Sequence, residues 1–165
     1  MSLLTSLRSL VLTLLLLAYP KAKIDQIPTK DIARSEDALR DMLFAFERIG
    51  VSEVEKAKLA PIVIVWSYYE SNWFASPTGN NDQGQACGVM QVHQPWIEIA
   101  GATCDTVRRD RILGYEIGIM RLRGFIAKCG SIRGGLTAFS MRGECPKTPG
   151  WTIKLVVDRC KIAGC

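Results

Sequence analysis

Glu70 is the residue whose type and position are best suited to chemistry. It follows an almost entirely apolar stretch, PIVIVWSYY at 61–69, and it precedes a segment at 75–87 that holds Gly, Asn, Asp, Ser and Pro in quick succession. Burial favours the protonated form of a carboxyl group, and such a group can give its proton to the departing sugar oxygen when a glycosidic bond breaks. Glu70 is therefore a candidate general acid, although taken alone it could also cap a helix or pair with an arginine at the surface.

Two other segments follow Glu70-Ser71 along the chain. They are NDQGQACGVMQVH at 81–93 and Ala138-Phe139-Ser140. Together the three segments resemble the Glu-Ser, Gly-Leu-Met-Gln and Ala-Tyr-Asn motifs of soluble lytic transglycosylases and goose-type lysozymes, in order and in spacing. The resemblance covers roughly residues 55–145, and the three motifs together are far more specific than any one of them.

The resemblance implies a lysozyme-like helical fold with a groove that holds several sugars of bacterial peptidoglycan. It implies that Glu70 protonates the β-1,4 bond between N-acetylmuramic acid and N-acetylglucosamine. In the transglycosylases the same carboxylate then acts as a base on the muramic C6 hydroxyl, which gives a 1,6-anhydro end without water. One carboxylate can therefore serve both steps.

Four more residues acquire roles by their position in these motifs. Ser71 would support the active site, whereas Gly88, Met90 and Gln91 would line the sugar groove. A residue without a side chain lets the backbone approach a substrate, a methionine supplies an apolar floor, and a glutamine supplies a hydrogen-bonding amide. For Met90, ordinary packing is an equally good interpretation.

The chain departs from the motifs at Phe139, where the family has a tyrosine, and at Ser140, where it has an asparagine. The family's tyrosine hydroxyl can reach the catalytic carboxylate, but a phenyl ring has no hydrogen to donate. Either Tyr68, Tyr69 or Tyr115 supplies a substitute hydroxyl, or the enzyme is slower. A third possibility is an inactive relative that only binds peptidoglycan.

Asp82 bears on the choice between transglycosylation and hydrolysis. It sits where goose-type lysozymes carry an aspartate that positions water, and His93 falls where a second aspartate would be. An inverting hydrolase needs a base about 6.5–9.5 Å from the acid, and Asp82 could be that base. An aspartate in an Asn-Asp-Gln-Gly sequence is also a common turn former. We therefore expect a lytic transglycosylase, with a hydrolytic lysozyme as the alternative.

The elements that must position these residues are predicted to be mainly helical. Apolar periodicity predicts a helix over 31–48 that ends at Gly50. Ser52 and Glu55 form a capping-box pattern that begins the next helix, and Pro61 either kinks this helix or starts a fresh one. Because its later part is apolar on nearly every face, this helix should lie in the middle of the core.

The second half of the chain continues the helical pattern. A helical turn is predicted at 96–100, a long helix at 106–128 that Gly130 ends, and a shorter helix at 132–139. The tail at 151–160 could be a helix or a strand, and we favour a helix. With no repeats or low-complexity linkers, the chain is expected to form one mainly α domain that disulfides cross-link. The resemblance implies that this domain is lysozyme-like, with a sugar-binding groove.

Residues 1–22 have the composition of a secretory signal. Arg8 precedes an apolar run at 10–18, which Tyr19, Pro20 and Lys21 close. A membrane-spanning helix needs roughly 20 apolar residues, so we favour cleavage near Ala22 over a permanent anchor. The catalytic domain would then comprise residues 23–165.

The six cysteines all follow this segment. An even number of cysteines in an exported chain predicts disulfides formed in an oxidising compartment, periplasmic or extracellular. Their pairing stays open, and some could be buried thiols. Only the clustering of Cys145, Cys160 and Cys165 indicates that the C-terminal tail is stapled.

No metal or cofactor is expected, because the chain has a single His and no C-x-x-C spacing. The net charge of +5 suits an anionic polymer such as the cell wall, although it would also suit nucleic acid or simple solubility. A basic tract with interleaved aromatic residues is absent, so nucleic acid is not an expected partner. We expect a monomer that binds peptidoglycan glycan strands and meets a membrane only through an uncleaved leader.

Overall fold

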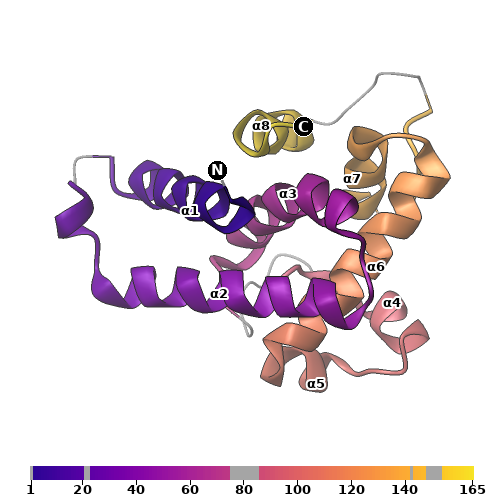
Figure 1. The fold of residues 1–165 in the computed structure, drawn as a ribbon. Helices are drawn as coiled ribbons and strands as arrows, with labels where there is room; N and C mark the ends of the chain where they lie inside the picture. The colour runs from indigo at the N-terminus through magenta and orange to yellow at the C-terminus, as the bar shows by residue number, and fades with distance from the viewer. Residues whose placement is uncertain (1, 21–22, 75–85, 142, 148–153) are drawn as a thin grey trace.

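The computed structural model describes residues 2–20, 23–74, 86–141, 143–147 and 154–165. Within these ranges the chain is mainly α, as predicted, and Figure 1 shows helices packed around α3. The elements, in chain order, are α1 (Leu3–Ala18), a 3-10 turn (Ile24–Gln26), α2 (Thr29–Arg48), α3 (Glu53–Ser71), β1 (Ala86–Cys87), β2 (Val92–His93), α4 (Gln94–Ile99), α5 (Cys104–Arg109), α6 (Arg111–Cys129), α7 (Ile132–Ser140) and α8 (Lys154–Ala163).

Helix α3 is the core helix that the sequence predicted. Its apolar residues from Ile62 to Trp66 are buried on every face of the helix. Ser52 caps it as expected, with its hydroxyl accepting a hydrogen bond from the Glu55 backbone N–H across 3.3 Å. The helix continues through Pro61 and does not begin again there. Burial of the following turns offsets the cost of the backbone hydrogen bond that proline cannot make.

Helix α1 packs against α2 and α3. Its buried face comprises Leu7, Val11, Leu14 and Leu15. On its outer side, Arg8 forms an ion pair of 2.9 Å with Glu36 of α2. In the described part of the chain, no helix has both the length and the apolar character needed to cross a membrane.

The prediction of one long helix over 106–128 was wrong. The structure has two helices there, α5 and α6, with Asp110 in an extended conformation between them. The Asp110 side chain accepts a hydrogen bond of 3.0 Å from the Leu113 N–H and so caps α6. Gly130 ends α6 with a φ of 71°, as predicted.

Three disulfides join successive cysteines along the chain, and they confirm the prediction of a stapled domain. They are Cys87–Cys104, Cys129–Cys145 and Cys160–Cys165. The last of them links Cys160 of α8 to Cys165, so this disulfide closes a short loop within the C-terminal segment. This cysteine usage indicates an oxidising environment.

Candidate functional site

Glu70 lies in the last turn of α3, where the helix leaves the core. Its side chain is 25% exposed, so it can reach solvent from a largely buried position. The chain reverses directly after it, because Asn72 and Trp73 both adopt positive φ values of 51° and 61°. Non-glycine residues rarely adopt this conformation. The Trp73 indole N–H compensates by donating to the Ile64 carbonyl across 3.1 Å, which fixes the reversal against α3.

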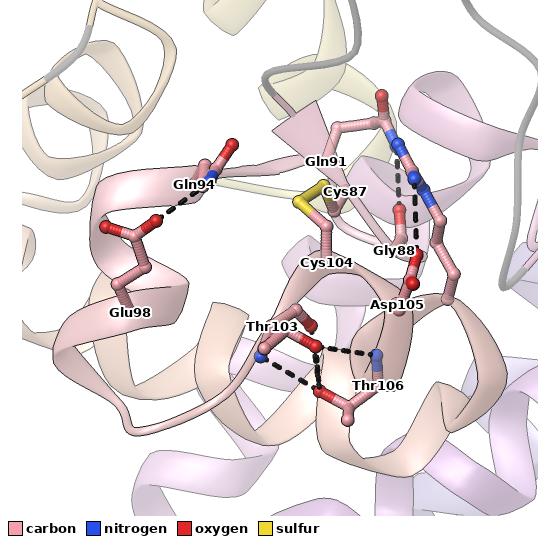
Figure 2. The surroundings of a disulfide bond; sticks show 10 residues. Cys87, Gly88, Gln91, Gln94, Glu98, Thr103, Cys104, Asp105 and Thr106 are labelled. Atoms are coloured by element: carbon pink, nitrogen blue, oxygen red, sulfur yellow. Dashed lines mark hydrogen bonds and ion pairs between the residues drawn. A yellow bond between two sulfur atoms is a disulfide. The ribbon is translucent and has the colours of Figure 1, made fainter.

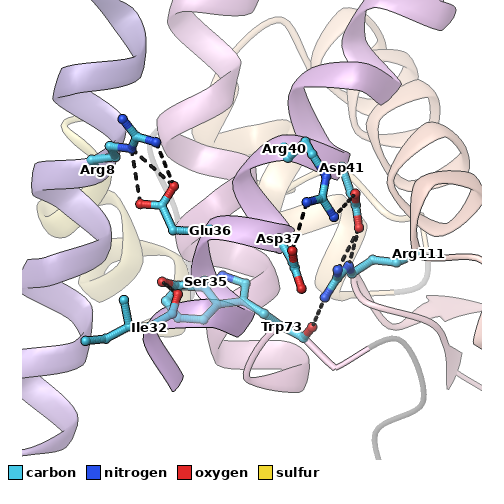
Figure 3. A network of polar contacts seen from close by, with 9 residues as sticks. All are labelled: Arg8, Ile32, Ser35, Glu36, Asp37, Arg40, Asp41, Trp73 and Arg111. Atoms are coloured by element: carbon cyan, nitrogen blue, oxygen red, sulfur yellow. Dashed lines mark hydrogen bonds and ion pairs between the residues drawn. The ribbon is translucent and has the colours of Figure 1, made fainter. Parts of the chain in front are cut away.

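A polar network holds this reversal from two other helices (Figure 3). Arg111 of α6 donates from Nε to the Asp41 carboxylate of α2 across 2.7 Å. The same guanidinium donates from Nη1 to the Trp73 carbonyl across 3.3 Å. Since Asp41 is 9% exposed, water screens this pair little. The end of α3 is therefore fixed relative to α2 and α6.

Ser71 connects the end of α3 to the segment at 88–91. Its hydroxyl lies 2.8 Å from the Val89 carbonyl oxygen and 2.8 Å from the Ser67 carbonyl oxygen, both within donating distance. Ser71 is 6% exposed and Val89 is fully buried, so this contact is internal. Two of the three segments singled out in the sequence are thus in direct contact.

The segment at 88–91 is a tight turn between β1 and β2 (Figure 2). The two strands pair antiparallel, Ala86 opposite His93. Gln91 turns back on Gly88, whose carbonyl accepts from the Gln91 backbone N–H at 3.0 Å and from its side-chain amide at 2.9 Å. The Cys87–Cys104 disulfide ties the turn to α5.

The structure gives Gly88 a role in the turn itself. Its φ is 74°, and a Cβ placed there would lie 2.3 Å from the Val107 Cγ1. Met90 also has a packing role, the alternative left open by the sequence. It is 1% exposed, and its sulfur lies so close to α6 that a Cβ on Gly118 would be 2.4 Å away.

Phe139 and Ser140 lie at the end of α7. Phe139 is buried and meets the Trp66 ring edge-on, with the centroids 6.1 Å apart. Ser140 donates to the Leu136 carbonyl of its own helix across 3.1 Å. The third segment therefore reaches α3 through Phe139, one helical turn before Glu70.

None of the three candidate tyrosine hydroxyls bonds to Glu70 within the described residues. The Tyr115 hydroxyl lies 3.1 Å from the Ser67 Oγ, and burial raises the pKa of Tyr115. The Tyr68 ring packs against Tyr69, with centroids 5.3 Å apart. Burial also raises the pKa of Tyr68. Among the described residues, the contact to Glu70 is therefore not made by a tyrosine hydroxyl.

The donor to Glu70 is Arg159 of α8. Its Nη1 lies 2.5 Å from the Glu70 Oε1. The arginine is 6% exposed, so this is not the surface pair that the sequence allowed as an alternative. The guanidinium carbon also lies 4.1 Å from the Trp66 ring centroid and 5.2 Å from that of Tyr69.

Sequence reasoning did not find Arg159. The one available signal was indirect. The C-terminal segment that carries Arg159 is basic, and the expected pattern lacks a hydroxyl donor at Phe139. Asp82, the candidate base for hydrolysis, lies outside the described residues. Within the described ranges, no group of three or more His, Cys, Asp or Glu side chains could hold a metal ion.

The arrangement offers one carboxyl group, partly open to solvent, on a rigid support with a fixed cationic partner. Such a group can exchange a proton with a ligand that reaches its exposed side. The chain matches no protein-family model, no curated protein and no solved structure with which it was compared.

Proposed function

We propose that this protein is a peptidoglycan lytic transglycosylase with a lysozyme-like fold. The observation that carries the proposal is the hydrogen bond from Ser71 to Val89. It joins the residue after the candidate acid to the turn at 88–91, the segment that the resemblance makes the wall of a sugar groove. Phe139, from the third segment, packs against Trp66 in the same helix as Glu70.

In the proposed reaction Glu70 first gives its proton to the glycosidic oxygen between N-acetylmuramic acid and N-acetylglucosamine. The bond from this oxygen to the muramic C1 breaks, and positive charge develops on the sugar ring. The Glu70 carboxylate then takes the proton of the muramic C6 hydroxyl, whose oxygen forms the new bond to C1. The acid is regenerated, and no water is consumed.

Transglycosylation is preferred over hydrolysis because it needs only one carboxyl group. A hydrolytic goose-type lysozyme would require Asp82 to position water, and an aspartate in an Asn-Asp-Gln-Gly sequence is more often a turn former. The partner in either reaction is a peptidoglycan glycan strand. We further propose that the protein is exported and acts as a monomer in the periplasm or outside the cell, in line with its three disulfides.

A second candidate function is a non-catalytic module that binds peptidoglycan. It is favoured by the ion pair, which engages Oε1 of Glu70, and by Phe139 in place of a hydroxyl donor. Such a module would bind purified wall sacculi without releasing soluble fragments. An enzyme would release them.

The test is digestion of purified sacculi by the wild type and by Glu70→Gln. We expect the wild type to release muropeptides and Glu70→Gln to release none. Glu98→Gln, at an exposed position in α4, is the matched control and should keep full activity. If Glu70→Gln were as active as the wild type, the assignment of the acid would be wrong.

The fold of Glu70→Gln has to be checked, because Arg159 loses its counter-charge. Removing one partner of a fully buried pair costs about 3–5 kcal/mol. The cost should be smaller here, since a quarter of the Glu70 side chain is exposed. Circular dichroism and a thermal melt of each variant separate a loss of folding from a loss of catalysis.

A further inference from the structure

We propose that Arg159 is the positioning residue of Glu70 and stabilises the negative charge that develops on it during proton transfer. This inference rests on the proposed function, because it assigns a partner to the same acid.

The contacts of Arg159 are those of a fixed group. Its Nη1 lies 2.5 Å from the Glu70 Oε1, and its guanidinium carbon lies 4.1 Å from the centroid of the Trp66 ring. Contact of a guanidinium with an aromatic face is favourable and restricts its rotation. Its Nε is buried and, within the described residues, has no hydrogen-bond partner. A buried cation with an unused donor is costly, and the ion pair with Glu70 and the contact with Trp66 offset this cost.

Helix α8 holds Arg159 in this place. In Figure 1 this helix lies beside α3 and α7, and it packs against both. Val156 is fully buried one turn earlier, and Cys160 forms a disulfide with Cys165. The carbonyl of Cys165 accepts from Arg133 of α7 at 2.9 and 3.1 Å. The Cys160–Cys165 disulfide and the hydrogen bonds from Arg133 therefore fix the end of α8 next to Arg159.

Phe139 contacts the same Trp66 ring. Its ring meets Trp66 edge-on at 6.1 Å, whereas Arg159 lies over the face of the same indole. Phe139 has no hydroxyl, but it supports the ring on which the cationic donor rests. A hydrogen-bond donor to the acid is thus supplied from α8 instead of α7.

The chemical role follows from the charge that proton transfer creates. When Glu70 gives its proton to the glycosidic oxygen, negative charge develops on its carboxylate, and Arg159 is already in place beside it. Removing one preorganised donor from the charge that develops on a substrate in a water-excluded site lowers kcat about 10²–10³-fold, and this sets an upper scale for Arg159. Because Glu70 is partly exposed, we expect a smaller effect, about 10–100-fold.

The experiment measures kcat and KM on solubilised glycan strands for the full chain and three variants. In Arg159→Met the side chain can still cover Trp66, so the fold should be kept while the charge is lost. We expect its kcat to fall about 10–100-fold with KM changed by less than about threefold. Arg159→Ala leaves room for added guanidinium ion, which should restore part of the lost kcat. Lys154→Gln, on an exposed residue of the same helix, should match the wild type.

An unchanged kcat in a folded Arg159→Met overturns the inference. So does a loss that appears only in KM, or a loss in Arg159→Ala that guanidinium does not reduce. If Arg159→Met does not fold, the rescue of Arg159→Ala decides in the same way, and failure of both variants to fold also counts against a positioning role. The proposed function fails separately, when the wild type itself releases no fragments or when Glu70→Gln stays active.

Discussion

The hydroxyl of Ser71 donates a hydrogen bond to the carbonyl oxygen of Val89 across 2.8 Å. This bond connects α3 to a turn that lies 18 residues further along the chain. Because both residues are buried, the bond holds the C-terminal turn of α3, which contains Glu70, against the turn at 88–91.

Replacing Ser71 with alanine should weaken both the fold and the proposed activity. The Val89 carbonyl would lose its donor in a place that water does not reach, which costs about 1–3 kcal/mol. Urea unfolding measures this cost. Ser35→Ala is the control, since the buried Ser35 hydroxyl donates to Ile32 of its own helix at 2.7 Å and to no other helix in the described part of the chain. It should change stability by less than about 0.5 kcal/mol, and equal costs for the two variants would contradict a special role of Ser71.

Gly118→Ala should disturb the turn from the side of α6. An added Cβ would lie 2.4 Å from the Met90 sulfur and 2.9 Å from the Met90 Cβ, so Met90 and its turn must shift. We expect a loss of about 1–3 kcal/mol together with a lower kcat. Gly124→Ala in the same helix meets nothing within 4 Å and should be neutral or stabilising by up to about 1 kcal/mol. If both variants have the same stability, the close approach of Met90 to α6 is incorrect.

Much of the fold was predictable because helices here follow from local patterns. Apolar spacing located α2, α3 and α7, and a glycine after the last apolar residue located the end of α6. The break at Asp110 was missed, because the apolar residues on both sides keep the helical spacing while a polar cap divides the helix. Disulfide pairing was not predictable, since it depends on which helix ends meet in space.

The candidate site was predictable in part. Local motifs singled out Glu70, Ser71 and the segment at 88–91, and the structure connects the segment to the end of α3 through Ser71. Arg159 was not predictable, because its contact with Glu70 spans 89 residues and depends on where the stapled tail packs. The roles of Gly88, Met90 and Gln91 toward sugar stay predictions, whereas their contacts within the turn are observed.

Removal of the Cys87–Cys104 disulfide should cost more stability than removal of Cys160–Cys165, whereas removal of Cys160–Cys165 should cost more activity. Cys87–Cys104 closes a span of 17 residues and Cys160–Cys165 a span of 5. Loop-closure entropy predicts how much each replacement lowers the free energy of unfolding. Replacing both cysteines of the first pair with alanine should lower it by about 3 kcal/mol, and replacing both cysteines of the second pair by about 2 kcal/mol. The second replacement should nevertheless lower kcat more, because α8 carries Arg159. Urea unfolding and kcat of both double variants test this, and a kcat that simply follows stability would contradict it.

Glu116 should make stability depend on pH. Burial is the main cause that raises the pKa of Glu116, and Arg48, at 2.9 Å from its Oε1, only partly opposes it. The folded protein holds this proton more tightly than the unfolded chain does. The contribution of Glu116 is therefore complete below the unfolded-state pKa and is lost as pH rises through the folded-state pKa.

Glu116→Gln cannot lose a proton at this position. Its free energy of unfolding, relative to the wild type, should therefore increase as pH rises from about 4 toward 7. Urea unfolding of both proteins across this range measures the difference. A difference that stays constant or decreases with pH would show that ionisation of Glu116 is not penalised.

The most direct measurement is mass spectrometry of fragments released from sacculi by the wild type in water enriched in oxygen-18. If Glu70 acts as acid and then as base on the C6 hydroxyl, the new muramic ends are 1,6-anhydro ends without the heavy isotope. Glu70→Gln in parallel should release no fragments. Reducing ends that carry oxygen-18 would contradict transglycosylation, and the absence of any fragment from a folded wild type would contradict the enzyme itself.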